Sequence, residues 1–251
     1  MRILHIHAHP DDAELFSGGT LALLAAKGHH VTIVTMTPGD CGSHHHSPDE
    51  IAAIRRQEAA SGAAIVGAEY FCAEFRDMAI FEDDGARRRV TAVLRRTQPD
   101  LVITASPIDY HCDHEATSRL VRDACFAAPA PNYDAPGGDP PMKAIPHLYF
   151  ADPAEGTDRD SRPAVPHFVV DIASVMDKKR AMLSAHESQR LWLKEHHGMD
   201  NFIETMEEWS AKVGKFASLA FGEGFRHYRM HPYPVTPLLE ELLGAAAIRR
   251  L

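Results

Sequence analysis

Short apolar segments alternate with segments of helical composition through the first half of the chain. Four short segments of mainly aliphatic, β-branched or aromatic residues are typical of buried β-strands: 2–7, 29–36, 69–75 and 101–106. Four further segments have the composition of helices: 20–27, 49–66, 84–97 and 114–127. Ser47 or Asp49 is the expected N-cap of the second helix. Because helices follow the strands, the pattern predicts a Rossmann-like α/β fold, with a mostly parallel sheet and helices on both faces.

The second half of the chain has a less regular pattern. Residues 128–146, APAPNYDAPGGDPPMKAIP, are rich in Pro and Gly, which predicts a long surface loop. Short apolar segments predict strands at 147–152 and 167–172. Helices are expected over 173–186 and 200–220, followed by a tail that prolines interrupt.

Length and composition favour a single domain. The 251 residues, of which 45% are hydrophobic, can bury one sizeable core. No internal repeat or linker divides the sequence. We therefore expect one domain over 1–251, with its core in about 1–190 and a C-terminal helical extension and tail in 191–251.

Charge and composition exclude several classes of protein. The chain has 26 Lys and Arg residues against 35 Asp and Glu, a formal net charge of −9, and no basic block that would favour a nucleic-acid partner. The N-terminus lacks the pattern of a signal peptide, and no apolar run approaches the roughly 18 residues of a membrane span. The four cysteines form no CxxC pair, so reduced thiols and a cytoplasmic location are expected.

Metal-binding side chains gather where two of the predicted strands end. HAHPDD overlaps the end of the first strand, and DYHCDHE follows the fourth. Ligand sites of open parallel sheets lie beyond the carboxyl ends of the strands, so the fold would bring these two segments together. Imidazole nitrogen and carboxylate oxygen are ligands that zinc favours.

The spacing indicates three metal ligands. His9 and Asp12 face one point if a helix begins just after Pro10, and His114 supplies a third ligand from the other strand end. Two neutral imidazoles and one carboxylate leave a bound zinc net positive, which lowers the pKa of its water toward about 7. Asp11 lies between the first two ligands, where it can take a proton from that water. Fe²⁺ accepts the same ligands.

Neighbouring residues complete the candidate site. His111 is either a fourth ligand or, when protonated, a group that stabilises an oxyanion or protonates a leaving amine. Asp113 would hold His111 through a hydrogen bond to its far ring nitrogen. Backbone amides at Gly18 and Gly19 would let a substrate approach closely. Together these groups indicate hydrolysis of an amide or an ester.

The motifs AHPDDAEL and DYHCDHEA resemble those of the LmbE-like de-N-acetylases, the superfamily of GlcNAc-phosphatidylinositol and GlcNAc-inositol deacetylases. The resemblance covers at least residues 3–189. It implies a PIG-L-type, zinc-dependent N-deacetylase of a small N-acetylated amino sugar or glycoconjugate, in a family whose members commonly form homo-oligomers. It also implies roles for the matching residues: zinc ligands His9, Asp12 and His114, general base Asp11, and His111, oriented by Asp113, for the tetrahedral intermediate.

The sequence departs from that family's pattern at two positions. Cys112 replaces the proline that usually follows the first histidine of the second motif, which loosens the backbone and places a thiol beside the site. Asp109 occupies the position at which some mycothiol-pathway members carry a mobile tyrosine. The substrate of those members is correspondingly less expected.

Substrate-binding residues are less closely specified. The candidates are three: Gly18, Arg55 and His186. Arg55 forms either a substrate contact or an ion pair with Glu58, one helical turn away. His186 and Gln189 either line the pocket or cap a helix, and the loop at 44–46 either covers the pocket mouth or is a plain polar loop. Four aromatic residues are expected to pack the C-terminal helices rather than to stack on a sugar: Trp192, Phe202, Trp209 and Phe216.

Three alternatives remain open. The pair His5-x-His7 matches the metal signature of amidohydrolase-type enzymes, but those enzymes need a closed barrel of about eight strand–helix units. A nucleotide-binding module needs a glycine-rich first turn, where this chain has HPDD. A non-catalytic metal- or carbohydrate-binding protein is suggested by the 17 histidines and predicts bound zinc without turnover.

Overall fold

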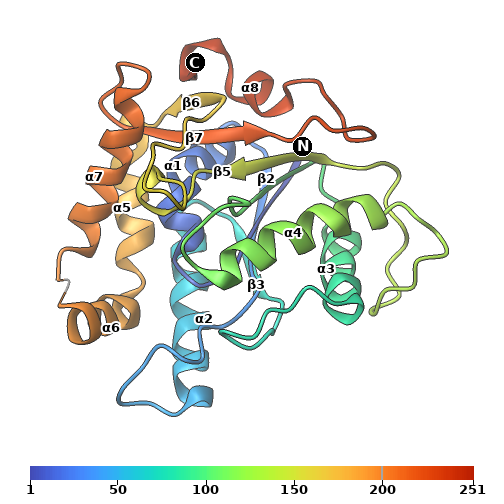
Figure 1. Cartoon of the computed structure of the whole chain (residues 1–251), viewed down its shortest axis with the longest axis horizontal. Helices are drawn as coiled ribbons and strands as arrows, with labels where there is room; N and C mark the ends of the chain where they lie inside the picture. Colours follow the sequence, from blue (N-terminus) through green and yellow to red (C-terminus); the bar gives the residue numbers. More distant parts are fainter. Residues whose placement is uncertain (199) are drawn as a thin grey trace.

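One open sheet organises the chain, as Figure 1 shows. The structure is a computed structural model that describes residues 1–198 and 200–251. Its strands lie in the order β3-β2-β1-β4-β5-β7-β6-β8. Their bounds are β1 (Arg2–His7), β2 (His30–Thr35), β3 (Glu69–Cys72), β4 (Leu101–Thr104), β5 (His147–Ala151), β6 (Phe168–Asp171), β7 (Gly222–His227) and β8 (Ile248–Arg250). Paired strands among β1 to β5 are parallel, and the pairs that involve β6, β7 and β8 are antiparallel.

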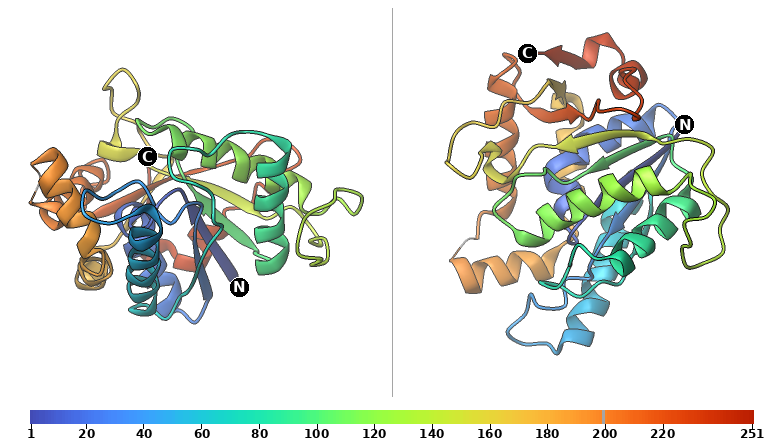
Figure 2. Two further views of the ribbon diagram at one scale, coloured as in Figure 1. Left: turned by 90° about the horizontal axis from the view of Figure 1, so that it is seen from below. Right: turned by 45° about the vertical axis from the view of Figure 1, so that its right-hand side comes forward.

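Helices cover both faces of this sheet, as Figures 1 and 2 show. Their bounds are α1 (Asp12–Ala26), α2 (Pro48–Ala64), α3 (Asp84–Thr97), α4 (Cys112–Ala127), α5 (Met176–Ser184), α6 (Glu187–His197), α7 (Phe202–Lys215) and α8 (Leu238–Leu243). Helices α3 and α4 pack on one face, and α1, α2 and α5 on the other. The predicted Rossmann-like, mostly parallel α/β fold is confirmed. Among the described residues, no helix is long and apolar enough to cross a membrane.

The alternation of side chains along β1 determines which residues reach the site. Ile3 joins the hydrophobic cluster on the α1 side of the sheet, and Leu4 and Ile6 join the cluster on the α3–α4 side. Because side chains alternate along a strand, His5 and His7 point toward α1 with Ile3. The His7 ring accordingly stacks on Phe16 of α1, with 5.2 Å between the ring centroids.

The first three helices show where the sequence pattern was sufficient and where it was not. The prediction of a helix over 84–97 is confirmed at both ends, and Ser47 caps α2 with a capping box to Glu50. Helix α1, predicted over 20–27, begins eight residues earlier, at Asp12. Its early turns contain Gly19, where a Cβ would lie 2.7 Å from Ile172. Glycine lowers helix propensity, but close packing requires it here.

Two strands in the C-terminal part were not predicted. Strand β7 pairs with both β5 and β6, so residues 191–251 complete the sheet as well as adding helices. The sequence of β7, GEGFRH, lacks the β-branched residues and the alternation that signal a strand. A Cβ at Gly224 would lie 1.9 Å from Asp152 Oδ2, so tertiary packing decides its glycine. The sheet is open, with β3 and β8 at its edges, which contradicts the closed barrel of the amidohydrolase alternative.

A buried ion pair joins β7 to two helices. Glu223 and Lys179 are 3% and 1% exposed, and Lys179 Nζ donates to Glu223 Oε1 at 2.7 Å. The Glu223 carboxylate also accepts the backbone N–H groups of Gly19, at 2.8 Å, and Thr20, at 2.7 Å. These donors come from α1 and α5, so one carboxylate ties the inserted strand to the helices behind the site.

We predict that Glu223→Ala lowers the free energy of unfolding by about 3–5 kcal/mol, because it leaves the Lys179 ammonium buried without its partner. Urea unfolding monitored by circular dichroism measures the change. Glu82→Ala, which removes an exposed pair with Arg119, is the control and should change that free energy by less than about 1 kcal/mol. Equal effects of the two substitutions would contradict the role of Glu223.

Candidate functional site

The carboxyl ends of β1 and β4 meet at the site. These strands are parallel neighbours, and the strand order reverses between them, since β2 and β3 lie on one side and β5 on the other. The segment 7–12 leaves the end of β1, and the segment 109–114 covers the end of the β4–α4 loop and the first turn of α4. The two polar segments therefore lie side by side, as expected for a switch point of an open α/β sheet.

Three side chains point their ligand atoms at one point. His9 Nδ1 is 3.2 Å from His114 Nε2 and 3.4 Å from Asp12 Oδ2, and His114 Nε2 is 3.3 Å from Asp12 Oδ1. All three residues are buried. Ligands of a tetrahedral metal with bonds of about 2.1 Å lie about 3.4 Å from one another. The spacing and the chemistry of these donors therefore fit a divalent cation such as zinc.

The Asp12 carboxylate is fixed by contacts from β1. Its Oδ2 accepts the backbone N–H of His9 at 2.7 Å and lies 2.7 Å from His7 Nδ1. His7 is 2% exposed and stacks on His5, two residues earlier on the strand. With Oδ2 occupied in this way, Oδ1 is the oxygen directed at His114.

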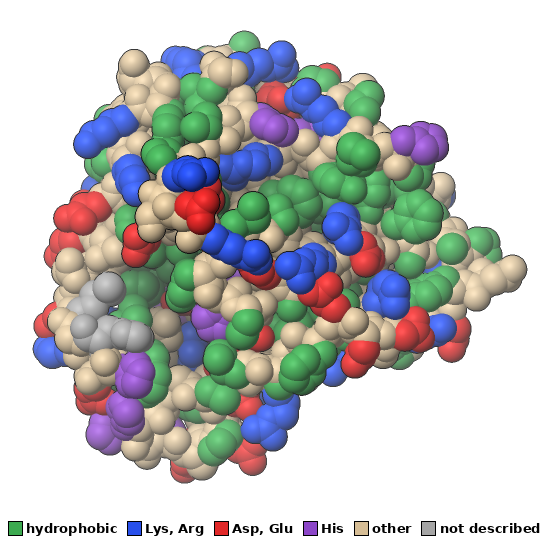
Figure 3. Space-filling model, viewed as in Figure 1, with side chains coloured by type: hydrophobic (Ala, Val, Ile, Leu, Met, Phe, Trp, Pro, Cys, Tyr) green, Lys and Arg blue, Asp and Glu red, His purple; other side chains and the backbone are tan. Residues whose placement is uncertain are grey.

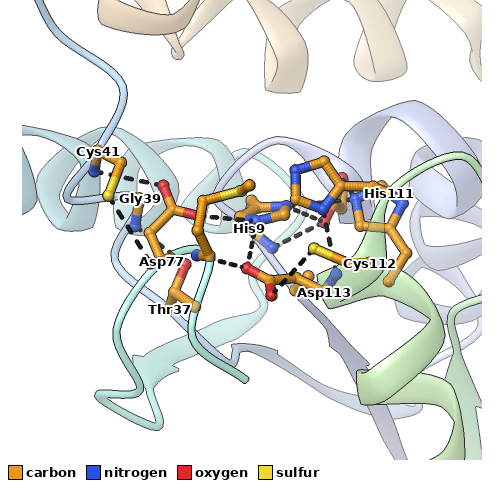
Figure 4. A network of polar contacts seen from close by, with 12 residues as sticks. His9, Thr37, Gly39, Cys41, Asp77, His111, Cys112 and Asp113 are labelled. Carbon is orange, nitrogen blue, oxygen red and sulfur yellow. Dashed lines mark hydrogen bonds and ion pairs between the residues drawn. The ribbon is translucent and has the colours of Figure 1, made fainter. Parts of the chain in front are cut away.

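Further carboxylates contact the far nitrogens of the two candidate imidazole ligands. His9 Nε2 is 3.1 Å from Asp77 and 3.4 Å from Asp113, and Figure 4 shows this network. His114 Nδ1 is 3.1 Å from Asp109. A carboxylate behind a metal-binding histidine fixes the ring orientation and raises its basicity.

Burial and carboxylates act against each other in this cluster. Burial lowers the pKa of His114, but Asp12 and Asp109 raise it to about 9. Burial raises the pKa of the Asp12 carboxyl, but His114 and His7 hold it well below its usual range. The negative field that favours a proton on these rings would favour a divalent cation in its place.

Asp11 is held in an unusual backbone conformation at the start of α1. Its φ is 101°, in the left-handed region that few non-glycine residues adopt and that occurs at functional sites. Arg55 donates to the Pro10 carbonyl at 3.0 Å and lies 3.9 Å from Asp11 Oδ1. Burial and the neighbouring Asp12 raise the pKa of Asp11 to about 7, against the effect of Arg55. A carboxyl with such a pKa exchanges protons near neutral pH.

His111 lies beside the cluster, and its contacts favour the neutral ring, one of the two states that the sequence left open. Its Nδ1 accepts the backbone N–H of Asp113 at 3.2 Å, which leaves the proton of a neutral ring on Nε2. The Asp113 carboxylate does not bond His111 as expected, because it accepts the Met78 N–H at 2.7 Å and faces His9. Burial, followed by His9 and His114, lowers the pKa of His111, which favours that neutral ring.

A cavity of 1210 Å³ lies over the cluster. Its lining includes His9, Asp12 and His114, with Asp11, Arg55 and His111. Other lining residues come from the 154–161 loop and from α6 and α7. In Figure 3 the surface is hollowed between the part that carries α6 and α7 and the part that carries α4.

Two of the three candidate substrate-binding residues lie elsewhere. Gly18 faces α5, where its Cβ would be 3.3 Å from Lys179, and His186 is 1% exposed with Nε2 3.5 Å from Glu14. Neither is among the described residues that line the cavity. The Gly18 amide lies inside α1, which begins at Asp12, and not at a helix start.

Arg55 and Gln189 do line the cavity. The alternative ion pair of Arg55 with Glu58 is not formed, because Glu58 accepts hydrogen bonds from Ser188. The 44–46 loop contacts α6, where the His44 ring lies 4.7 Å from that of Trp192.

The aromatic residues of the C-terminal helices combine packing with exposure to the cavity. Three of the four that were expected only to pack also line the cavity, and these are Trp192, Phe202 and Trp209. Phe216 is not among the described lining residues.

Sequence reasoning missed three residues of the site: His7, Asp77 and Asp109. Asp77 lies in the loop after β3, and nothing in its local sequence, FRDMA, marks it as a neighbour of His9. Asp109 was noted only as a departure from a family pattern, although its distance of five residues from His114 places it at the same loop. His7 was considered only as part of the His5-x-His7 signature of another enzyme class, and its side-chain direction on β1 was the signal that could have placed it at this site.

Comparison with known proteins finds one family model and relatives with two different activities. Residues 4–125 match the family model described as PIG-L: GlcNAc-PI de-N-acetylase. The chain is 27% identical over 244 residues to a diacetylchitobiose deacetylase of Thermococcus kodakarensis, which covers 90% of this chain and 82% of that protein. It is 29% identical to a 4-oxalmesaconate hydratase of Pseudomonas putida, over 75% of this chain and 74% of that protein.

A solved structure shares the fold. The N,N'-diacetylchitobiose deacetylase from Pyrococcus horikoshii superimposes with a TM-score of 0.75 and 27% identity. The match covers 94% of this chain and 88% of that chain.

We predict that the cavity thiols react before the core thiol. Cys41 and Cys112 are exposed and line the cavity, whereas Cys125 is buried, and burial raises its pKa. A maleimide added to the native protein should label Cys41 and Cys112 within minutes and Cys125 only in denaturant. Peptide mass spectrometry locates the label, and Cys112→Ser identifies its signal. Labelling of Cys125 at the rate of Cys112 in the native protein would contradict the described packing.

Proposed function

We propose that this chain, whose residues 4–125 match the PIG-L family model, is a metal-dependent hydrolase that removes an acetyl group from an amino sugar or a GlcNAc-containing conjugate. The observation that carries the proposal is the convergence of His9 Nδ1, the Asp12 carboxylate and His114 Nε2 beneath a large cavity. The reaction is amide hydrolysis: water oxygen bonds to the acyl carbon, the C–N bond breaks, and the products are acetate and a free amine.

His9, Asp12 and His114 would hold the cation. Zinc is the proposed metal, and Fe²⁺ fits the same donors. When bound, such a cation supplies Lewis acidity, which polarises the amide carbonyl and makes water more acidic. Asp77, Asp113 and Asp109 keep the two imidazoles oriented, since their carboxylates face the far ring nitrogens.

Asp11 and His111 carry the proton transfers and the charge of the intermediate. Asp11 takes a proton from the attacking water, and Arg55 holds its carboxylate in place. His111 donates from Nε2 to the oxygen that becomes negative, since its Nδ1 is occupied by the Asp113 N–H. The proton on Asp11 then passes to the departing nitrogen, which leaves as the amine. Arg55, which lines the cavity, is the proposed substrate contact.

We predict that Asp11→Asn and Asp12→Asn separate catalysis from metal binding. Asp11→Asn removes the proton acceptor and should lower kcat by about 100- to 10,000-fold with the metal content unchanged. Asp12→Asn removes an anionic ligand, so both metal and activity should be lost. Metal content by mass spectrometry and amine release on the same samples measure the two effects. Loss of metal in Asp11→Asn would contradict the division of roles.

The proposed function is tested by an amine-release assay across N-acetylated amino sugars and their conjugates. We expect free amine from at least one substrate, its loss on treatment with a chelator, and its return with Zn²⁺ or Fe²⁺. The same preparation is assayed for hydration of 4-oxalmesaconate, because one relative bears that name. Hydration without amine release would replace the proposal with a hydratase. Bound zinc with neither activity would favour the non-catalytic alternative.

A further inference from the structure

One side of the cavity is formed by apolar side chains from three helices. These residues, called the apolar wall below, are Leu15, Phe16, Trp192, Leu193, Phe202 and Trp209. Phe16 and Phe202 belong to the large hydrophobic cluster on the α1 side of the sheet, and Leu15, Leu193 and Trp209 pack against it. The wall is therefore the part of the protein core that the cavity exposes.

The apolar wall begins directly at the candidate metal ligands. Phe16 lies one helical turn after Asp12 on α1, and its ring centroid is 6.1 Å from that of His114. The Phe16 ring also stacks on Trp209 of α7, with 6.4 Å between the ring centroids and 13° between the ring planes.

Two polar residues of the cavity, Arg55 and Asp77, lie on the opposite side of the cluster from Phe16. Contacts run in order from Asp77 to His9, from His9 to His114, and from His114 to Phe16. Arg55 lies on the Asp77 side, because its guanidinium packs against Gly39 and Gly42 and the intervening Cys41 contacts Asp77. A carbonyl carbon held at the cluster thus has hydrogen-bonding groups on one side and the apolar wall on the other.

The two substituents of an amide match this division. The sugar, on the nitrogen, has hydroxyl groups that need the polar side, and the acyl chain, on the carbon, is apolar. The cavity, of 1210 Å³, has room for an acyl chain longer than acetyl beside the sugar.

We propose that the apolar wall is an acyl-binding site and that this chain removes straight acyl groups longer than acetyl, of about four to eight carbons, from amino sugars. The inference rests on the proposed function, whose chemistry is unchanged. Water oxygen bonds to the acyl carbon, the C–N bond breaks, and the products are a short fatty acid and the free amine.

The test uses the full chain and N-acetyl, N-butanoyl, N-hexanoyl and N-octanoyl glucosamine. We expect kcat/KM to rise roughly three- to fourfold for each added methylene until the wall is covered, because each methylene leaves water. Hexanoate should inhibit more strongly than acetate for the same reason. Turnover of the acetyl substrate with equal or slower turnover of the longer ones would overturn the acyl site and leave the proposed function standing. Absence of amine from every substrate would overturn the proposed function itself.

Substitution of the wall gives an independent measurement. Trp209→Ala should lower the ratio of hexanoyl to acetyl turnover at least tenfold, because it removes the largest aromatic surface beside Phe16. Phe216 directly follows the last residue of α7 and is not among the described residues that line the cavity. Phe216→Ala is therefore the matched control and should keep the wild-type ratio. An unchanged ratio in Trp209→Ala would overturn the assignment. Where that variant does not fold, the chain-length series and the inhibition by hexanoate decide the question.

Discussion

The site depends on the separate contacts that the two carboxylate oxygens of Asp12 make. Oδ2 accepts the His9 backbone N–H and lies against His7, at the end of β1. This leaves Oδ1 directed at His114, in the first turn of α4. Any shift of β1 against β4 would separate the three candidate ligand atoms. The parallel pairing of the two strands, from Ile3 with Leu101 to Ile6 with Thr104, therefore fixes the geometry that the chemistry needs.

Such a concentration of buried carboxylates is costly unless opposite charges compensate it. Arg55 neutralises part of the charge beside Asp11, and the imidazoles of His9 and His114 have carboxylates on both sides. A divalent cation would complete the balance at the point where the ligand atoms converge. The left-handed backbone of Asp11 is a further cost of the site. This strain is tolerated because it directs a carboxyl into the cavity.

The sequence predicted those parts of the molecule that are determined locally. The strand ends at 7–12 and 109–114 could be paired because the switch-point rule applies to any open parallel sheet. Strand β7 could not be predicted, because its glycines are required by contacts with Asp152 and Val169, far away in the sequence. The contact of Asp77 with His9 could not be predicted for the same reason, because only the order of the strands brings the loop of Asp77 against His9. Gly18 was expected at the start of a helix because the start of α1 was placed eight residues too late.

Helix α1 links the candidate catalytic centre to the proposed acyl site. It begins with Asp12, continues one turn later with Leu15 and Phe16, and is tied to β7 through the carboxylate of Glu223. Asp12 and Phe16 lie on one rigid helix, so the distance between them is fixed. An acyl chain packed on Phe16 would therefore place its carbonyl at the ligand cluster without movement of a loop. The opposite side of the cavity is formed by loops at 39–42 and 77–78. Selectivity for the acyl group would accordingly be set by helix packing, and selectivity for the sugar by loops that can change more freely between related chains.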